Sequence, residues 1–256
     1  MNFLELYKHP HLIGAHRGAS CLAPENTMEA LEKSVGHCDF IEIDVQLTRD
    51  AEAVVFHDDT LERTTDIAKH PEFGSRKPFK VSDFTLDELA SLDYGMWFEP
   101  NPHAEPVLTL YATLNFIKKH NLYLNIEIKN MHGVFEDVEA VAKVLEMIEQ
   151  TKTSHLILLS SFYHPYLKIA KKLAPHIPTA ALTEDKHPCE TMEELLGYLR
   201  DLEVCAYHID LSLADRYAIK ELKEAGFYVG VYTVNSPKKA NELFFMGVDA
   251  IFSDDA

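Results

Sequence analysis

Residues 40–57, FIEIDVQLTRDAEAVVFH, contain two runs of strand-forming residues joined by a very short link. The first run, FIEIDVQLT, alternates polar with apolar side chains, and the second, AVVFH, consists mainly of apolar residues that favour strands. A parallel crossover needs about a dozen residues or more, and this link holds only a handful, so the two runs are expected to form an antiparallel hairpin. With the turn centred between Asp50 and Ala51, Asp44 would lie opposite His57.

Seven further runs of this kind occur along the chain, and amphipathic stretches such as 24–35 and 136–150 lie between them. The runs are LIGAH (12–16), LYLNIEIK (122–129), HLILLSSF (155–162), PTAALT (178–183), CAYHID (205–210), FYVGVYTV (227–234) and DAIFS (249–253). Alternation of strands with helices predicts a parallel sheet. Eight such strands favour a closed (β/α)8 barrel, or TIM barrel, over an open doubly wound sheet, for which the chain also lacks a glycine-rich nucleotide loop. We therefore expect one α/β barrel domain over residues 1–256.

The composition fits one globular domain. A chain of 256 residues of which 46% are hydrophobic can form a full core. No apolar stretch is long enough to span a bilayer, and the N-terminus has no signal-peptide pattern, so we expect a cytoplasmic protein without stable membrane insertion. The four cysteines lack C-x-x-C spacing and are expected to be reduced thiols.

The formal net charge of -17 argues against a nucleic-acid partner and against docking on anionic membranes. An enzyme that acts on an anionic substrate would need local positive charge from a metal ion or from a few Arg and Lys side chains. The sequence does not indicate an oligomeric state.

Acidic residues gather on two neighbouring strands of the predicted barrel. Glu42 and Asp44 share one face of their strand, and Glu127 and Lys129 share one face of the next, because side chains two residues apart point the same way. Burying three carboxylates together is costly unless something compensates, and oxygen ligands suit Mg²⁺ or Ca²⁺. One divalent cation is therefore expected at these three acids. The alternative is an internal salt bridge from either acid of the first strand to Lys129 or Arg17.

Two histidines flank the predicted acidic site. His16 ends the first strand, at the end of a parallel barrel where active sites are built, and His57 arrives beside the acids through the hairpin. Neutral and protonated imidazole are both accessible near pH 7, so the pair suits general acid–base catalysis. Arg17 has a fork geometry that matches a phosphate, and Gly18 would allow the backbone to approach a ligand closely.

Short motifs spread over nearly the whole chain resemble the signature of the glycerophosphodiester phosphodiesterases. They are GAHRG (14–18), PENT (24–27), EID (42–44), TRD (48–50), HDDTLERTT (57–65), EIK (127–129), SF (161–162), VYTVN (231–235) and GVDAIFSD (247–254). No single motif is specific, and their order and spacing carry the resemblance.

The resemblance implies a distorted barrel related to the phosphatidylinositol-specific phospholipases C, with a small insertion at about residues 58–106 after the hairpin. It also implies that a small-molecule glycerophosphodiester is hydrolysed to glycerol 3-phosphate and an alcohol. The residues that match the family's functional positions are the catalytic pair His16 and His57, the metal ligands Glu42, Asp44 and Glu127, and the phosphate contacts Arg17 and Lys129. Tyr232 stands where the family usually has Trp and is expected to contact the substrate. The resemblance leaves open which histidine is the acid, whether a glycerol hydroxyl or water attacks first, and whether Mg²⁺ or Ca²⁺ binds.

Three other functions fit parts of the sequence. A lysophospholipase D or a sphingomyelinase D-like enzyme would use the same histidines and acids, but such enzymes usually have an apolar rim, and the sequence has no long apolar loop. A metal-dependent amidohydrolase needs H-x-H on the first strand, whereas His9 and His11 precede that strand and flank Pro10. A catalytically silent binding barrel would be expected to lack a histidine or an acid of the set, and all are present.

The remaining expectations concern the insertion and the N-terminus. Thr85 and Glu88 have the spacing of a capping box and predict a helix. The basic stretch 67–80 is expected to be a solvated loop, with a basic lip over the active site as the alternative. Residues 2–9 are expected to cover part of the outer layer beside the last strand.

Overall fold

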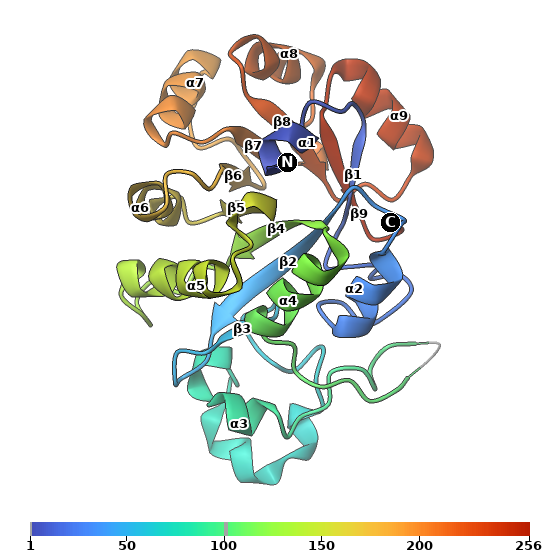
Figure 1. Ribbon diagram of the computed structural model, residues 1–256, viewed down its shortest axis with the longest axis vertical. Helices are drawn as coiled ribbons and strands as arrows, with labels where there is room; N and C mark the ends of the chain where they lie inside the picture. The colour runs from blue at the N-terminus through green and yellow to red at the C-terminus, as the bar shows by residue number, and fades with distance from the viewer. Residues whose placement is uncertain (1, 100–101) are drawn as a thin grey trace.

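The computed structural model describes residues 2–99 and 102–256, and its centre is a closed barrel of parallel strands (Figure 1). The barrel strands are β1 (Leu12–Ala15), β2 (Phe40–Leu47), β4 (Tyr123–Ile128), β5 (Ile157–Ser161), β6 (Thr179–Thr183), β7 (Ala206–Asp210), β8 (Tyr228–Tyr232) and β9 (Ala250–Ser253). The sheet closes because β1 pairs in parallel with both β9 and β2. All of the predicted barrel strands are present in their predicted order, which confirms the TIM barrel.

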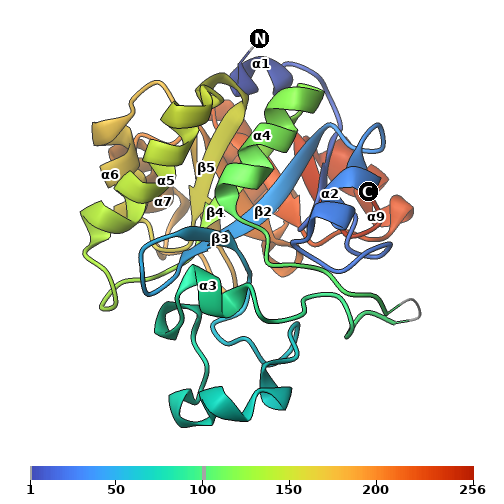
Figure 2. The ribbon, with the colours of Figure 1, turned by 60° about the horizontal axis from the view of Figure 1, so that its bottom comes forward.

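Helices cover the outside of the barrel between successive strands (Figures 1 and 2). They are α2 (Met28–Ser34), α4 (Leu110–His120), α5 (Asp137–Thr151), α6 (Pro165–Leu173), α7 (Met192–Asp201), α8 (Arg216–Glu224) and α9 (Pro237–Met246). The outward side chains of β2, such as Ile41 and Ile43, pack with Leu114 and Ile117 of α4 in one apolar cluster. Because successive side chains alternate across a strand, this packing turns the intervening acids of β2 into the barrel. No helix in the described part of the chain is long and apolar enough to cross a membrane.

The hairpin after β2 is present, but its register differs by one residue from the predicted one. β3 (Ala53–Val55) runs antiparallel to β2, with Gln46 opposite Val54. The amide of Phe56 donates a hydrogen bond to the carbonyl oxygen of Asp44 at 2.9 Å. Phe56 therefore takes the place opposite Asp44 that was predicted for the next residue along the chain.

The turn explains the shift. The amide of Thr48 donates to the carbonyl of Glu52 at 3.0 Å, and the amide of Ala51 donates to the carbonyl of Thr48 at 2.9 Å. Ala51 has the left-handed φ of 59°. A type I turn followed by a left-handed residue makes a three-residue hairpin loop, so the hairpin is centred on Asp50 rather than on the bond after it.

Figure 2 shows that the chain between β3 and α4 leaves the barrel. The apolar side chains of its described residues form a cluster of their own. This segment contains three short 3-10 helices at 67–69, 71–76 and 81–83, and the one-turn helix α3 (Leu86–Leu89). The predicted capping box is confirmed, because the Thr85 side chain accepts from the Glu88 amide and the Glu88 side chain accepts from the Thr85 amide.

The stretch 67–80 is not simply a solvated loop. Its apolar residues Ile67, Phe73 and Phe79 are buried in the cluster of this segment. The guanidinium of Arg76 donates to the Glu88 carboxylate at 2.7 and 2.8 Å. The stretch also forms no basic lip over the predicted site, since none of its residues lines the cavity that contains Glu42 and Glu127.

The N-terminal residues close the amino end of the barrel instead of covering its outer layer. Helix α1 (Phe3–Leu6) lies across the end opposite to the α3 segment (Figure 2). Phe3 is fully buried and its ring meets the edge of Phe40 at 5.8 Å between centroids. The Tyr7 hydroxyl forms a hydrogen bond with Nε2 of the buried His208 at 3.1 Å. Phe3, Leu6 and Tyr7 of this segment therefore belong to the core of the barrel.

Candidate active site

The carboxyl ends of β2 and β4 bring three acids together inside the barrel. Parallel pairing sets Glu42 beside Asn125 and Asp44 beside Glu127, and all four side chains are buried. One carboxylate oxygen from each of the three acids lies within 4.8 Å of the others. The carboxamide oxygen of Asn125 is buried without a hydrogen-bond partner on the wall of the same cavity. Oxygen donors gathered in this way fit a hard divalent cation.

Two basic side chains offset part of this negative charge. Nζ of Lys129 lies 2.8 Å from a carboxylate oxygen of Glu127 and 3.5 Å from one of Asp44. Nε of Arg17 lies 3.6 Å from the other oxygen of Asp44. Asp44 thus forms the internal salt bridges that were the alternative to a metal site, and it also belongs to the acid cluster.

The electrostatics leave the cluster under-compensated. Burial would raise the pKa of Asp44, but nearby positive charges, above all Lys129, lower it. Burial and the charge of Asp44 raise the pKa of both Glu42 and Glu127. The two basic side chains, Lys129 and Arg17, therefore do not neutralise the three buried acids. A divalent cation bound among the acids would balance the remaining negative charge.

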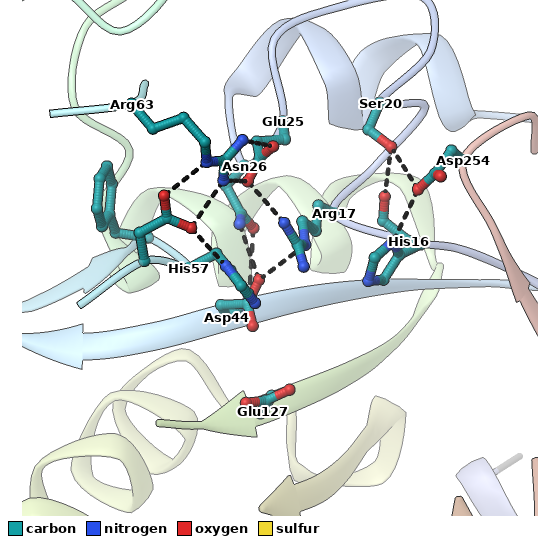
Figure 3. A network of polar contacts seen from close by, with 12 residues as sticks. His16, Arg17, Ser20, Glu25, Asn26, Asp44, His57, Arg63, Glu127 and Asp254 are labelled. Atoms are coloured by element: carbon teal, nitrogen blue, oxygen red, sulfur yellow. Dashed lines mark hydrogen bonds and ion pairs between the residues drawn. The ribbon is translucent and has the colours of Figure 1, made fainter. Parts of the chain in front are cut away.

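Each of the two histidines is held by an aspartate through Nδ1, as Figure 3 shows. Nδ1 of His16 lies 2.7 Å from Asp254, and Nδ1 of His57 lies 2.7 Å from Asp58. A carboxylate at Nδ1 holds the proton on that nitrogen and fixes the orientation of the ring. Both rings line the cavity that contains Glu42 and Glu127, so Nε2 is the atom that each can offer to a substrate.

Asp254 is itself held by neutral donors. It accepts from Nδ2 of Asn235 at 2.7 Å and from the hydroxyl of Ser20 at 3.1 Å. Burial raises the pKa of Asp254, but the hydrogen bonds from His16 and Asn235 outweigh it and lower the pKa to about 2. The partner of His16 is therefore an ionised carboxylate.

Asp58 is held by a chain of ion pairs, and Figure 3 shows the part of this chain that joins Arg63, Glu25 and Arg17. Arg63 donates to Asp58 at 2.6 Å and, through its other nitrogens, to Glu25 at 2.7 Å. Glu25 in turn accepts from Arg17 at 2.9 Å. Burial raises the pKa of Asp58, and the hydrogen bonds from His57 and Arg63 lower it by more. This chain connects one histidine to the arginine that lies beside the acid cluster.

The backbone at Arg17 has the left-handed φ of 59°, which is rare outside glycine and is found preferentially at functional sites. The conformation directs its amide to Oε2 of Glu42 at 2.9 Å. Gly18 follows with a φ of 79°, and a Cβ there would lie 2.8 Å from the backbone of Ala30 in α2. Gly18 is therefore needed for close packing against that helix, and the predicted approach of its backbone to a ligand is wrong, since Gly18 does not line the cavity.

Glu42, Glu127, the two histidines, Arg17 and Lys129 line one open cavity of about 520 Å³, whereas Asp44 is buried beside Glu127 and does not line it. Its opposite wall comes from β5 to β8 and includes Phe162 and Tyr232. The Tyr232 hydroxyl donates to the carbonyl of Thr183 at 2.6 Å. Tyr232 thus faces the cavity, where its ring and the acceptor side of its hydroxyl are available to a substrate while the hydroxyl proton is bound to Thr183.

Sequence reasoning missed the groups that support the predicted site. Asp58 and Asp254, which orient the histidines, and Asn26, which donates to Asp44 at 2.9 Å, all lie inside motifs that had been noticed but given no role. The adjacency of His57 and Asp58 in the sequence could have suggested one pair. No local signal joins His16 to Asp254, because 238 residues separate them.

Carboxylates that can hold a cation, imidazoles that can move protons and basic groups that can contact an anion occur together here at the carboxyl ends of barrel strands. This combination fits a hydrolase that acts on a phosphate ester. The chain is a member of the glycerophosphoryl diester phosphodiesterase family, whose model matches residues 16–256.

Individual relatives agree with this assignment. The chain is 32% identical over 245 residues to a glycerophosphodiester phosphodiesterase of Caldanaerobacter subterraneus subsp. tengcongensis, with 95% of this chain and 94% of that protein covered. It is 33% identical over 246 residues to a glycerophosphodiester phosphodiesterase of Bacillus altitudinis, with 94% of each covered. The solved structure of an Oleispira antarctica phosphodiesterase in complex with the product sn-glycerol-3-phosphate matches with a TM-score of 0.86 and 32% identity, covering 98% of this chain and 95% of that one.

Proposed function

We propose that this enzyme hydrolyses glycerophosphodiesters to glycerol 3-phosphate and an alcohol, with His16 and His57 as the acid–base pair and a divalent cation, Mg²⁺ or Ca²⁺, at Glu42, Asp44 and Glu127. The observation that carries the proposal is the placement of two aspartate-anchored imidazoles on one cavity with Glu42 and Glu127, two acids of the cluster. The product named for the Oleispira antarctica neighbour, sn-glycerol-3-phosphate, is the product that we propose for this enzyme.

The roles of the side chains follow from their charges. Arg17 and Lys129 would contact the phosphate, since both carry positive charge on the cavity wall. A divalent cation held by the three carboxylates would supply Lewis-acid stabilisation of a nonbridging phosphate oxygen.

The two histidines move the protons. One imidazole enters neutral and takes the proton of the attacking hydroxyl at Nε2, and the other enters protonated and gives its proton to the leaving alkoxide as the bond from phosphorus to that oxygen breaks. If the attacking hydroxyl belongs to the glycerol, a cyclic phosphate forms, and water opens it with the two histidines in exchanged roles. Asp58 and Asp254 keep both rings aimed throughout, because each is bonded to the far nitrogen.

A product assay tests the proposal. Glycerophosphocholine, glycerophosphoethanolamine, glycerophosphoinositol and lysophosphatidylcholine are each incubated with the protein and Mg²⁺ or Ca²⁺. We expect release of glycerol 3-phosphate from the glycerophosphodiesters. Cleavage of the lysophospholipid alone would assign the protein to the lysophospholipase D or sphingomyelinase D-like enzymes, and no cleavage of any substrate would indicate a silent barrel.

A further inference from the structure

A second cavity of about 400 Å³ adjoins the active-site cavity, and the two share His16 and Arg17. Trp97 and Phe98, from the segment between β3 and α4, line the second cavity and do not line the first. We propose that this second cavity binds the alcohol half of the substrate and selects a cationic amino alcohol, such as choline or ethanolamine. The inference rests on the proposed function.

A phosphate bound by Arg17 would have one of its two ester arms in each cavity. Arg17 is the basic residue common to both cavities, and a phosphate that it contacts lies at their boundary. A phosphodiester has two ester arms that leave the phosphorus in different directions. The arm in the first cavity would lie beside the acid cluster, where a glycerol hydroxyl can be activated, so the second cavity is left for the alcohol.

Two aromatic residues, Trp97 and Phe98, form one wall of the second cavity. The rings of Trp97 and Phe98 meet edge to face, with centroids 5.8 Å apart. The indole Nε1 of Trp97 donates to the carbonyl of Tyr94 at 2.8 Å, and the amide of Phe98 donates to the carbonyl of Gly95 at 3.0 Å. The Arg63 guanidinium lies over the Trp97 ring at 6.0 Å from its centroid. Because the indole N–H also has a partner, the wall offers a ligand the Phe98 ring and the part of the Trp97 ring that Arg63 leaves open, rather than a hydrogen-bond donor. Fixed aromatic faces attract cations.

The lining of the second cavity contains more acidic than basic side chains. The second cavity is lined by three carboxylates, from Glu25, Asp254 and Asp255, and by the one guanidinium of Arg17. Glu25 is paired with both Arg17 and Arg63, and Asp254 is bonded to His16. The exposed Asp255 carboxylate is left as negative charge that no ion pair in the described residues offsets. Negative charge beside aromatic rings complements an ammonium group and repels an anionic one.

A pair of substrates that differ only in charge tests the inference. Glycerophosphocholine is compared with the phosphodiester of glycerol and 3,3-dimethylbutan-1-ol, in which a neutral carbon replaces the nitrogen. We expect kcat/KM of the wild-type enzyme to be about tenfold or more higher for the choline ester, since cation–aromatic contacts contribute about 0.5–2 kcal/mol each.

Three variants locate the effect. Trp97→Leu and Phe98→Leu remove an aromatic face, and Asp255→Asn removes a charge. Each should lower the ratio of kcat/KM for the choline ester over the neutral ester by about threefold or more. Met96→Leu is the matched control, because Met96 is half exposed and lines neither cavity, and it should leave the ratio unchanged.

The outcomes separate this inference from the proposed function. Equal kcat/KM for both esters in the wild-type enzyme, or equal losses on both esters in all three variants, would overturn the cationic alcohol site while leaving glycerophosphodiester hydrolysis intact. Failure of the wild-type enzyme to cleave either ester in the presence of a divalent cation would overturn both.

Discussion

Glu42, Asp44 and Glu127 put three carboxylates into a barrel interior that provides two basic side chains for them. Apolar residues at these positions would make a more stable protein, because buried charge is costly unless it is fully compensated. Excess charge of one sign in a closed core is therefore evidence for function, and it has a measurable consequence for stability.

Glu42→Gln should stabilise the metal-free protein while abolishing activity. Burial and the charges of Asp44 and Glu127 raise the pKa of Glu42, so its ionised carboxylate is unfavourable in the fold, and removing a buried uncompensated charge typically changes stability by about 1 kcal/mol or more. We expect the free energy of unfolding without metal to rise by about 1 kcal/mol or more, measured by urea denaturation in the presence of a chelator. The exposed Glu52→Gln is the control and should change neither quantity. A Glu42→Gln protein less stable than wild type would contradict the charge argument.

The two histidines allow a prediction about turnover. His16→Ala and His57→Ala should each lower kcat for glycerophosphodiester hydrolysis by about 10²–10⁴, because each removes a proton transfer. The double variant should lose less than the product of the two losses, since both residues act in one step. His37→Ala, on an exposed histidine, is the matched control. Full activity in either single variant would refute the role of that residue.

At the scale of elements, the barrel strands could be predicted because each is an apolar run bounded by polar residues, and β2 and β4 showed their acidic faces by alternation alone. The register of the hairpin could not be predicted, because it depends on a left-handed φ at Ala51, which alanine seldom adopts. The stretch 67–80 was misjudged for a related reason. Its few apolar residues are spaced irregularly and are buried only by the packing of the whole segment.

Ala51 provides a test of the turn. An L-residue in the left-handed region is disfavoured by about 1 kcal/mol relative to glycine, so Ala51→Gly should raise the free energy of unfolding by about that amount. Ala53→Gly, in β3 two residues away, should lower it by about 0.5–1 kcal/mol, because glycine weakens a strand. Denaturant midpoints of the two variants measure both effects. Destabilisation of similar size in both would mean that Ala51 is not strained.

At the scale of the molecule, residues from opposite ends of the chain meet at both ends of the barrel. His16 and Asp254 meet at the active site, and Tyr7 and His208 meet in the floor below it. Individual catalytic residues could be proposed from motifs, but these partnerships arise only when the barrel closes, and for that reason the sequence could not reveal them.

The buried His208 at the amino end of the barrel should make the stability of the fold fall at low pH. Burial lowers the pKa of His208 to about 3, whereas an unfolded histidine titrates near 6.5. The unfolded state therefore binds the proton first, and stability present above about pH 6.5 is lost as the pH falls toward 3. Between pH 7 and pH 5 this one residue should account for about 2 kcal/mol of the loss.

Urea denaturation at the two pH values measures this contribution. His208→Gln should remove it, whereas Tyr7→Phe, which deletes the hydrogen bond to His208 and keeps the imidazole, should retain it. An unchanged pH dependence in His208→Gln would show that the imidazole is not held neutral in the fold.

The most direct test of the central claim is the release of glycerol 3-phosphate from glycerophosphocholine, followed by ³¹P NMR, with protein stripped of metal and then supplied with Mg²⁺ or Ca²⁺. The account predicts no product from the stripped wild-type protein, and product once the cation is added. The Glu127→Gln protein, which lacks one carboxylate of the cluster, should stay far slower than wild type at the same cation concentration. Undiminished release by the stripped protein, or no release after either cation is added, would contradict the account.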